Sequence, residues 1–379
     1  MVYLDHNATS PLRAEARDAA ELALGIGGNA SSVHGRGRAA RAVVEGARAQ
    51  VAALAGARPE GVIFTSGGSE ANALALWGAV HGAGEQGVRI TRLFVSAIEH
   101  ESVFANAAAL GERVAGLRLE GIPVTSDGVA DLEALRTKLR EGKGRALIAL
   151  MAANNETGVV QPVTEAAELA QETGALLLVD AVQAAGKIAI PAADYVSLSA
   201  HKIGGPQGAG ALILRPGAPF AAQILGGGQE HGRRAGTENL PGIAGFGAAA
   251  EIAARELGAK DAVLRDRFEA GLTLVAPDTV IFGVAVPRLA NTSNFALPGL
   301  SAETAIMALD LDGVMVSSGS ACSSGKVKPS HVLAAMGVSE ELSRSALRAS
   351  FGWNSNESDV KAALSSISRL LARIRARAA

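Results

Sequence analysis

Short runs of apolar residues alternate along the chain with segments whose apolar positions recur every three or four residues. The second pattern, as in SEANALALWGAV (69–80) and TEAAELAQETG (164–174), predicts amphipathic helices. Continuous apolar strands that alternate with helices are typical of a mostly parallel sheet with helices on both faces. The apolar runs predict strands at 61–66, 92–97, 146–152, 175–180, 195–200 and 210–215.

After about residue 245 this alternation changes. One long helical pattern, 246–272, leads into the strands TVIFGV (279–284) and TSNFALP (292–298) and then into further helices, the last near 357–376. We therefore predict an α/β protein with a large α/β domain and a smaller α+β domain near which the opening segment packs. The large domain is expected to span residues 12–250, and the small one residues 1–11 and 251–379.

The composition argues against several classes of protein. The chain has 379 residues, of which 48% are hydrophobic, so it can bury a sizeable core. A net charge of −2 and a pI near 6.4 create no field that attracts nucleic acid or an anionic membrane. The longest apolar stretch, 243–254, is too short to span a bilayer.

The cysteine content and the first residues of the chain point to a cytoplasmic protein. A single cysteine allows no intrachain disulfide, which fits a reducing compartment. The first thirteen residues lack the apolar core of a signal peptide.

The basic end, 369–379, is either a tail that docks a partner or, as we favour, a final helix whose arginines complement its C-terminus.

That single cysteine, Cys322, lies among serine, glycine and alanine from residue 317 to residue 324. Such residues neither pack a core nor hold one backbone shape, so we expect an exposed loop that carries a thiol. Structural cysteines are buried among apolar residues, whereas reactive ones lie partly exposed in polar surroundings. The context favours a functional thiol.

Two predicted strand ends carry polar residues that suit a bound ligand. Gly67, Gly68 and Ser69 stand between a strand and a helix start, where free N–H groups favour an anion such as phosphate; an ordinary capped turn explains them equally well. Asp180 ends another strand and Gln183 follows one turn later. The Asp180 carboxylate could bind a metal, cap a helix or pair with a positively charged ring nitrogen.

The next predicted strand ends in Ser199, His201 and Lys202. A lysine without acidic neighbours in the sequence is either an ordinary surface residue or an amine of lowered pKa that forms imines. An aspartate followed about twenty residues later by Ser-x-His-Lys is the arrangement that pyridoxal phosphate (PLP) needs. In it a carboxylate faces the ring nitrogen, and the lysine binds the cofactor covalently.

Four other histidines do not indicate a metal site. His34, His81, His231 and His331 share no ligand spacing with one another or with Cys322. We therefore expect no metal bound by the protein.

Nine motifs, in this order along the chain, resemble those of the cysteine desulfurases of class V aminotransferase fold. The resemblance runs from residue 3 to about residue 355 and implies the aspartate aminotransferase-like fold of PLP-dependent transferases. The form of the cysteine motif resembles the long-loop branch that serves nitrogen fixation and general iron–sulfur assembly. The motifs are YLDHNATSP, FTSGGSEAN, SAIEHESV, NNETGVVQPV, VDAVQAAGK, SAHKIGGPQGAG, GGGQEHGRRAGTEN, SSGSACSSG and ALRASFG.

The resemblance implies PLP as the cofactor and assigns residues to its ring. Lys202 would bind the cofactor covalently and later move a proton at the substrate Cα. Asp180 would pair with the ring nitrogen, and Gln183 would bind the ring hydroxyl. His100 would stack on the ring and assist proton transfer; alternatively it is a histidine that only caps a surface helix.

The resemblance also assigns the phosphate and substrate contacts. Asn155 and Arg348 would bind the substrate carboxylate, with a two-pronged contact from the guanidinium. The residues assigned to the phosphate are Gly68, Ser69, Ser199, His201 and, from the partner subunit of a homodimer, Thr237.

The activity implied is the conversion of L-cysteine to L-alanine, with the sulfur carried on Cys322 as a persulfide. A sulfur-acceptor protein, such as an iron–sulfur scaffold, would then receive it. The rival functions are an aminotransferase or selenocysteine lyase of the same fold, and a non-catalytic sulfur relay. A plain aminotransferase has no use for a thiol on a serine–glycine loop, and a relay has no use for Lys202, Asp180 and His100.

Overall fold

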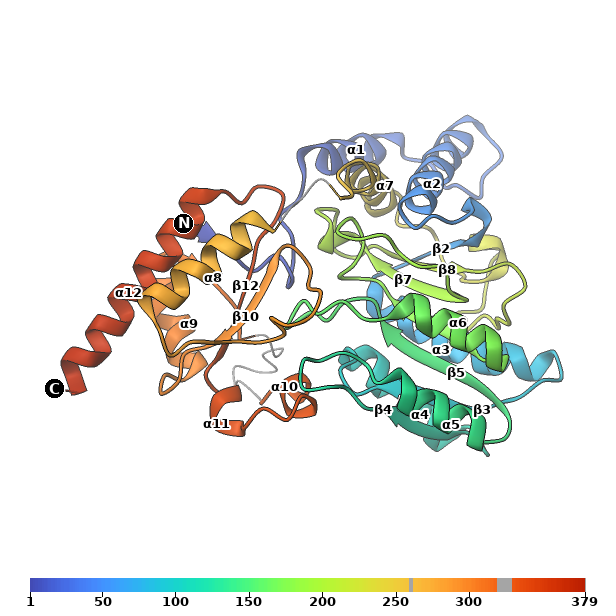
Figure 1. Ribbon diagram of the computed structural model, residues 1–379. Helices are drawn as coiled ribbons and strands as arrows, with labels where there is room; N and C mark the ends of the chain where they lie inside the picture. Colours follow the sequence, from blue (N-terminus) through green and yellow to red (C-terminus); the bar gives the residue numbers. More distant parts are fainter. Residues whose placement is uncertain (259–261, 319–328, 379) are drawn as a thin grey trace.

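The computed structural model describes residues 1–258, 262–318 and 329–378. A larger and a smaller sheet, each with its own helices, form the two halves of the molecule (Figure 1). In the larger sheet β8 is antiparallel to both neighbours, and the other strands run in one direction. The order is β2 (Val62–Thr65), β8 (Gly210–Leu214), β7 (Tyr195–Ser199), β6 (Leu176–Asp180), β5 (Arg145–Met151), β3 (Ile90–Ser96) and β4 (Arg118–Ile122).

The six predicted strands are therefore confirmed, and helices cover both faces of their sheet. Strand residues alternate between two cores: Ile148 and Leu150 of β5 pack in one, and Leu147 and Ala149 in the other. The first core includes α1 (Ala14–Ile26), α2 (Gly35–Leu54), α5 (Leu132–Glu141), α6 (Val163–Thr173) and α7 (Leu240–Arg255). The second includes α3 (Gly68–Glu85) and α4 (Glu101–Arg113).

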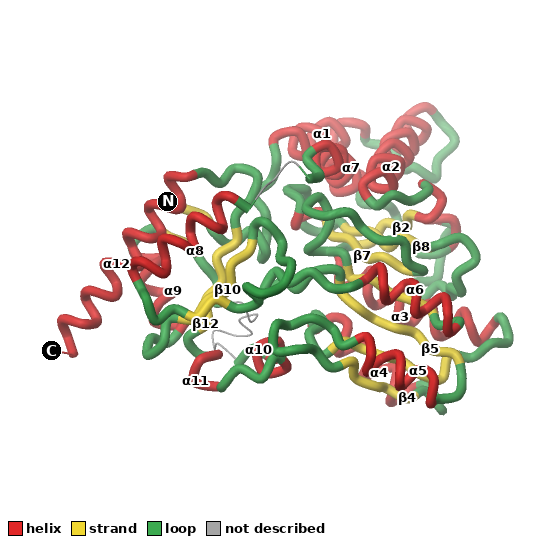
Figure 2. The backbone as a smooth tube through the Cα atoms, in the orientation of Figure 1, coloured by secondary structure: helices red, strands yellow, loops and turns green. Residues whose placement is uncertain are grey.

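The smaller half is built on the antiparallel order β12 (Ala346–Ser350), β10 (Thr292–Ala296) and β9 (Val280–Ile281). The ring of Phe268 meets those of Phe295 and Phe351 edge-on, at 5.5 and 5.9 Å between centroids, in its core. Figure 2 shows the helices beside this sheet. They are α8 (Val263–Val275), α9 (Ala302–Leu311) and α12 (Glu357–Ala378), with the short α10 (His331–Ala335) and α11 (Glu340–Ser343) nearby.

The opening segment joins the smaller half, as expected. Its strand β1 (Val2–Tyr3) pairs in parallel with β11 (Val314–Met315), and Asp5 bridges to Ser350 of β12. The boundary that we expect between residues 250 and 251 remains a prediction, and it falls within α7.

Two sequence expectations differ from the structure. The single helical pattern over 246–272 is divided between α7 and α8, and Gly258 beyond α7 has a φ of +75°, which suits the end of a helix. The sequence also gave no indication of β4, an edge strand whose residues RLEGI are mostly exposed. Exposed edge strands lack the apolar run that identifies buried ones.

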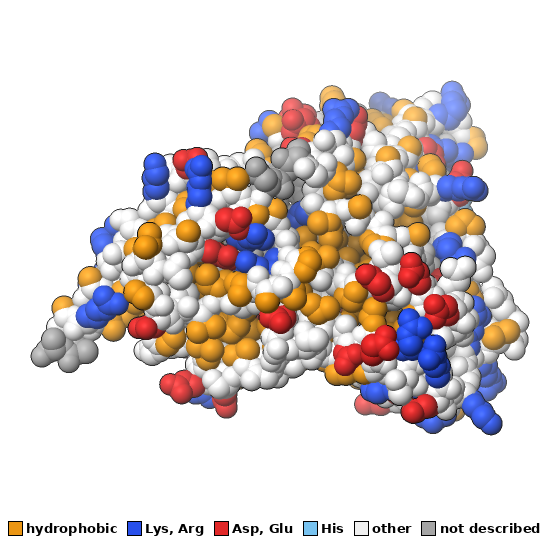
Figure 3. Space-filling view, in the orientation of Figure 1, with side chains coloured by type: hydrophobic (Ala, Val, Ile, Leu, Met, Phe, Trp, Pro, Cys, Tyr) orange, Lys and Arg blue, Asp and Glu red, His pale blue; other side chains and the backbone are white. Residues whose placement is uncertain are grey.

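The surface agrees with the small net charge. Figure 3 shows acidic and basic side chains of both signs on the visible face, with hydrophobic ones gathered where the two halves meet. Within the described ranges, no helix combines the length and the apolar character needed to cross a membrane.

A buried ion pair fixes the segment before α7 to the larger half. Arg48 of α2 donates to both carboxylate oxygens of Glu230, at 2.6 and 3.1 Å, and both side chains are 3% exposed. Glu230 also accepts a hydrogen bond from the Phe64 amide of β2. Glu230 and His231 have φ values of 48° and 57°, unusual for residues other than glycine, so these contacts hold a backbone conformation that would otherwise be disfavoured.

We expect Arg48→Met to lower the free energy of unfolding by about 3–5 kcal/mol, because it leaves the Glu230 carboxylate buried without its counter-charge. Urea denaturation measures the loss. The control is Arg255→Met, which removes an exposed ion pair with Glu251 and should cost less than about 1 kcal/mol. Equal losses in the two variants would contradict the role of the buried pair.

Candidate active site

The carboxyl ends of β6 and β7 meet the first turn of α3 at one place. Asp180 is the last residue of β6, and Lys202 ends the short 3₁₀ turn that follows β7. Gly68 stands at the start of α3, where an added Cβ would lie 2.7 Å from Val182 Cγ2 and 3.5 Å from Ser199 Cβ. The structure thus brings together three strand-end motifs that lie far apart in the sequence, at the edge where ligands bind in open α/β sheets.

Asp180 is 6% exposed and its carboxylate is held from two sides. One oxygen accepts the Val182 amide at 3.0 Å, and the other accepts the side-chain amide of Asn72 at 2.8 Å. Within the described part of the chain, no cluster of three or more His, Cys, Asp or Glu residues is arranged so that it could hold a metal ion, around Asp180 or elsewhere. These contacts leave the carboxylate suited to pair with a positively charged ring nitrogen, and the sequence analysis gave Asn72 no role.

The amine of Lys202 lies between opposing charges. Burial and the positive charge of Arg348 lower its pKa to about 8, although Asp5 and Asp180 act in the opposite direction. Its Nζ donates to the main-chain carbonyls of Asn7 and Ala8, at 2.7 and 2.8 Å. A substantial fraction of the amine is therefore neutral near pH 8, as imine formation requires.

The opening segment forms one wall of the site, which the sequence analysis did not foresee. The Asn7 carbonyl also accepts the side-chain amide of Gln183 at 2.9 Å. Thr9 Oγ1 lies 3.1 Å from Nδ1 of His201. Burial, followed by the charge of Lys202, lowers the pKa of His201 to about 4, so its ring is neutral at pH 7. The motif YLDHNATSP (3–11) was the available indication that this segment belongs to the site. Contacts made by its main-chain carbonyls cannot be predicted from the residue types.

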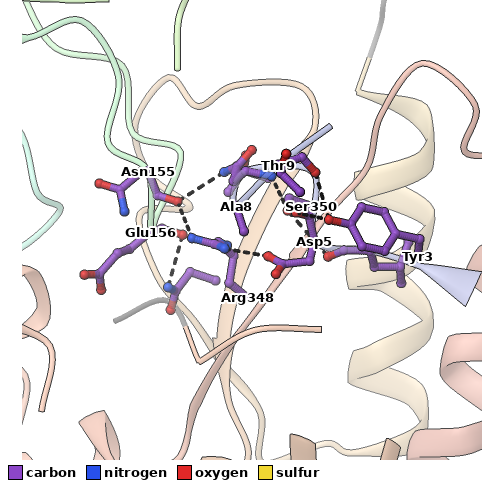
Figure 4. Close-up of polar contacts among 12 residues, drawn as sticks. Tyr3, Asp5, Ala8, Thr9, Asn155, Glu156, Arg348 and Ser350 are labelled. Carbon is purple, nitrogen blue, oxygen red and sulfur yellow. Dashed lines mark hydrogen bonds and ion pairs between the residues drawn. The ribbon is translucent and has the colours of Figure 1, made fainter. Parts of the chain in front are cut away.

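Arg348 and Asn155 lie together, and they meet through the main chain of Asn155. Arg348 Nη1 donates to the Asn155 carbonyl at 3.0 Å, and Nη2 pairs with the Asp5 carboxylate at 2.6 Å (Figure 4). The Arg348 side chain is 4% exposed, and its buried Nε–H has no hydrogen-bond partner among the described residues. A buried donor without a partner is costly, so this N–H suits a carboxylate oxygen of a ligand. Asp5 was not foreseen as its ion-pair partner.

His100 is the N-cap of α4, so the helix-capping reading of this residue is correct in part. Its Nδ1 accepts the Ser102 amide at 3.1 Å and lies 2.8 Å from the Ser102 hydroxyl. Glu99 beside it is 1% exposed, with one oxygen accepting the Met151 amide. Burial and the nearby charge of Asp180 raise the pKa of Glu99 well above its usual range, which favours the neutral acid there.

The other predicted residues lie at the rim of the site or outside the described residues. Ser69 is exposed in the first turn of α3. Thr237 is exposed in a segment that an ion pair between Arg234 and Glu70 ties to the same turn, at 2.8 Å. Cys322 lies outside the described residues.

The described residues that flank residues 319–328 both lie against the site. On one side, the main chain of Ser317 exchanges two hydrogen bonds with that of Arg348. On the other, Ser330 Oγ donates to the Glu156 carboxylate at 2.5 Å. Ser317 and Ser330, on the two sides of these residues, are therefore fixed next to Arg348 and Glu156.

Together these residues fit the parts of PLP. Asp180 suits the ring nitrogen, the Lys202 amine suits the aldehyde, and the free N–H groups at the start of α3 suit the phosphate. The lack of room for a side chain at Gly68 is consistent with close approach between that turn and the ends of β6 and β7.

Comparisons with known proteins agree with this geometry. The family model described as aminotransferase class-V matches residues 2–363. A cysteine desulfurase of Cereibacter sphaeroides is 45% identical, over 92% of this chain and 89% of that protein. An IscS-like cysteine desulfurase of Mycobacterium tuberculosis is 38% identical, over 99% and 97%. The solved structure of a NifS-like protein from Rickettsia africae superposes with a TM-score of 0.88 at 32% identity, over 98% of this chain and 99% of that one.

We expect acetylation of Lys202 in the cofactor-free protein to reach half its maximal rate near pH 8, because burial and Arg348 disfavour the ammonium form. Competitive labelling with acetic anhydride and peptide mapping measures this, with exposed Lys361 as the internal reference. Arg348→Gln should move the midpoint upward by removing the opposing charge. A midpoint near 10.5 in the unsubstituted protein would mean that the amine is not perturbed.

Proposed function

We propose a sulfur-transfer mechanism for this chain, which belongs to the class-V aminotransferases and, within them, to the cysteine desulfurases. It is a PLP-dependent enzyme that converts L-cysteine to L-alanine and transfers the sulfur. The observation that carries the mechanism is the position of the Lys202 amine. Burial and the charge of Arg348 lower its pKa, and the charges of Asp5 and Asp180 partly offset that shift. One place thus holds an amine, an anchor for a ring nitrogen and an anchor for a carboxylate.

In this proposal, three residues contact the cofactor ring. Asp180 would pair with the ring nitrogen, Gln183 would bind the ring hydroxyl, and His100 would stack on the ring and assist proton transfer at the substrate. When bound, PLP withdraws electrons from the Cα of an amino acid attached to it. The phosphate is held by Gly68, Ser69, Ser199 and His201, with Thr237 from the partner subunit of a homodimer.

The substrate carboxylate is placed against Arg348. Its unpartnered Nε–H and the adjacent Nη2 form one edge of the guanidinium, which matches the two oxygens of a carboxylate. The main-chain carbonyl of Asn155 orients that guanidinium, and the Asn155 side chain completes the carboxylate site. This orientation directs the substrate Cα toward Lys202, which removes and returns its proton.

Cys322 is the proposed sulfur acceptor. Its thiolate attacks the sulfur of the bound cysteine, an S–S bond forms as the C–S bond breaks, and the electron pair left on carbon takes up a proton to give alanine. Support comes from its place in the chain, because the described flanks of its segment contact Arg348 and Glu156. The persulfide then passes to an acceptor protein, for which we propose an iron–sulfur scaffold in the cytoplasm.

We expect Cys322→Ser to lower the release of alanine and sulfide from L-cysteine by orders of magnitude, because a serine hydroxyl is not ionised near neutral pH and cannot hold a persulfide. Cofactor absorbance and cysteine binding should persist, since other residues provide them. Assays of both products, beside an assay of keto-acid turnover, distinguish this activity from an aminotransferase. Substantial desulfuration by the serine variant would mean that sulfur is eliminated directly.

Replacement of Arg348, the proposed anchor of the substrate carboxylate, should weaken the use of L-cysteine while the protein stays folded. Arg348→Lys keeps the charge but loses the planar two-pronged edge, so we expect kcat/KM for L-cysteine to fall roughly 10- to 100-fold. Steady-state kinetics measure the change. Arg344→Lys is the control, because Arg344 is exposed and its side chain pairs, among the described residues, only with Glu340 on the surface. Similar kinetics in the two variants would place the substrate carboxylate elsewhere.

A further inference from the structure

Asn72 lies at the centre of a buried network that the proposed mechanism does not use. It stands in the first turns of α3, is 1% exposed, and contacts three different elements. Its side-chain amide nitrogen donates to Asp180 at 2.8 Å and to Ser102 Oγ at 3.0 Å. Its amide oxygen accepts the hydroxyl of Ser197 at 2.6 Å. All of its side-chain hydrogen-bonding groups therefore have partners.

The chemistry of these partners fixes the orientation of the amide. The Asp180 carboxylate can only accept hydrogen bonds, so the nitrogen of Asn72 must face it. Ser197 is fully buried and its hydroxyl then donates to the oxygen on the other side. The same nitrogen carries a second hydrogen, which is directed at Ser102. The donor direction from Asn72 to Ser102 thus follows from the carboxylate.

This direction extends to His100. Because Ser102 Oγ accepts from Asn72, its own hydrogen is available for Nδ1 of His100, 2.8 Å away. The Ser102 main-chain N–H points at the same Nδ1, at 3.1 Å. A ring nitrogen that receives an N–H needs its lone pair and carries no proton. The proton of the neutral ring is therefore on Nε2, which makes no hydrogen bond to any described residue.

We propose that Asn72 and Ser102 are positioning residues that hold the imidazole of His100, in the tautomer set by the Ser102 main-chain N–H, and link it to the Asp180 carboxylate. The inference rests on the proposed function, in which His100 assists proton transfer at the bound substrate. The Asn72 amide holds the carboxylate that faces the ring nitrogen of the cofactor, and it also directs the hydroxyl that orients the His100 imidazole. A histidine held in the other tautomer would present a lone pair where a donor is needed.

The test is Ser102→Ala in the holoenzyme, with Ser102→Thr as the conservative variant that keeps the hydroxyl. We expect the alanine variant to lower kcat about tenfold with KM for L-cysteine little changed, and the threonine variant to restore kcat. Nitrogen-15 NMR of histidine-labelled holoenzyme, with the His100 signals assigned by His100→Gln, reads the tautomer directly. All three proteins should show protonation at Nε2, because each keeps the Ser102 main-chain N–H, but only in the alanine variant should the Nδ1 signal move toward that of a nitrogen with fewer hydrogen bonds.

Asn106→Ala is the matched control for packing around Ser102. Asn106 donates to the main-chain carbonyl of Ser102 at 2.8 Å and does not touch the hydroxyl, so its loss should leave kcat and the Nδ1 signal unchanged. Asn72→Ala is the second variant, and it should lower kcat and move the Nδ1 signal in the same direction as Ser102→Ala, because Ser102 loses the donor that directs its hydrogen. Circular dichroism verifies that each variant is folded.

The outcomes separate this inference from the proposed function. If His100→Ala retains wild-type kcat, His100 has no part in proton transfer and that element of the proposed function fails. If His100→Ala loses activity while Ser102→Ala and Asn72→Ala keep both the wild-type kcat and the wild-type Nδ1 signal, the proposed function stands and the positioning role is overturned.

Discussion

The buried guanidinium of Arg348 is the charge on which the arrangement of the site depends. A buried positive charge is tolerated only where a counter-charge and hydrogen-bond acceptors surround it. Here the Asp5 carboxylate and the Asn155 carbonyl provide them, and these residues belong to the opening segment and to the loop after β5. Satisfying one side chain of β12 therefore fixes three distant parts of the chain against one another. The same charge contributes to the lowered pKa of Lys202, so a side chain of the smaller half adjusts an amine at the strand ends of the larger half.

The opening segment acts mainly through its backbone. The Asn7 carbonyl accepts hydrogen bonds from both Lys202 and Gln183, and the Ala8 carbonyl accepts a second one from Lys202. Main-chain carbonyls accept hydrogen bonds whatever side chain they carry, so such a wall depends on the path of the chain more than on residue type. The side chain of Asn7 fixes that path by donating to Thr292 and to the Asn155 carbonyl.

Two hydrogen-bond networks thus divide the site between them. The network of Arg348 joins the two halves of the molecule through Asp5 and the Asn155 carbonyl. The network of Asn72 lies within the larger half and joins Asp180 to Ser102. Both are largely buried, where hydrogen bonds to charged groups are stronger and unpaired groups are costly. Their members therefore have few alternative arrangements, which keeps the groups around Lys202 in fixed positions.

The sequence by itself determined six of the seven strands of the larger sheet and placed the candidate residues at their ends. Apolar runs of five to seven residues identify buried strands, and aspartate and lysine at their ends indicate chemistry whatever their partners are. Edge strand β4 and the division between α7 and α8 were missed, because an exposed strand and a local helix end leave weak patterns. Only the tertiary structure decided which groups face Lys202 and Arg348. Asp5, Asn7 and Asn72 acquire their roles from contacts across more than a hundred residues, and no local pattern records a contact at that separation.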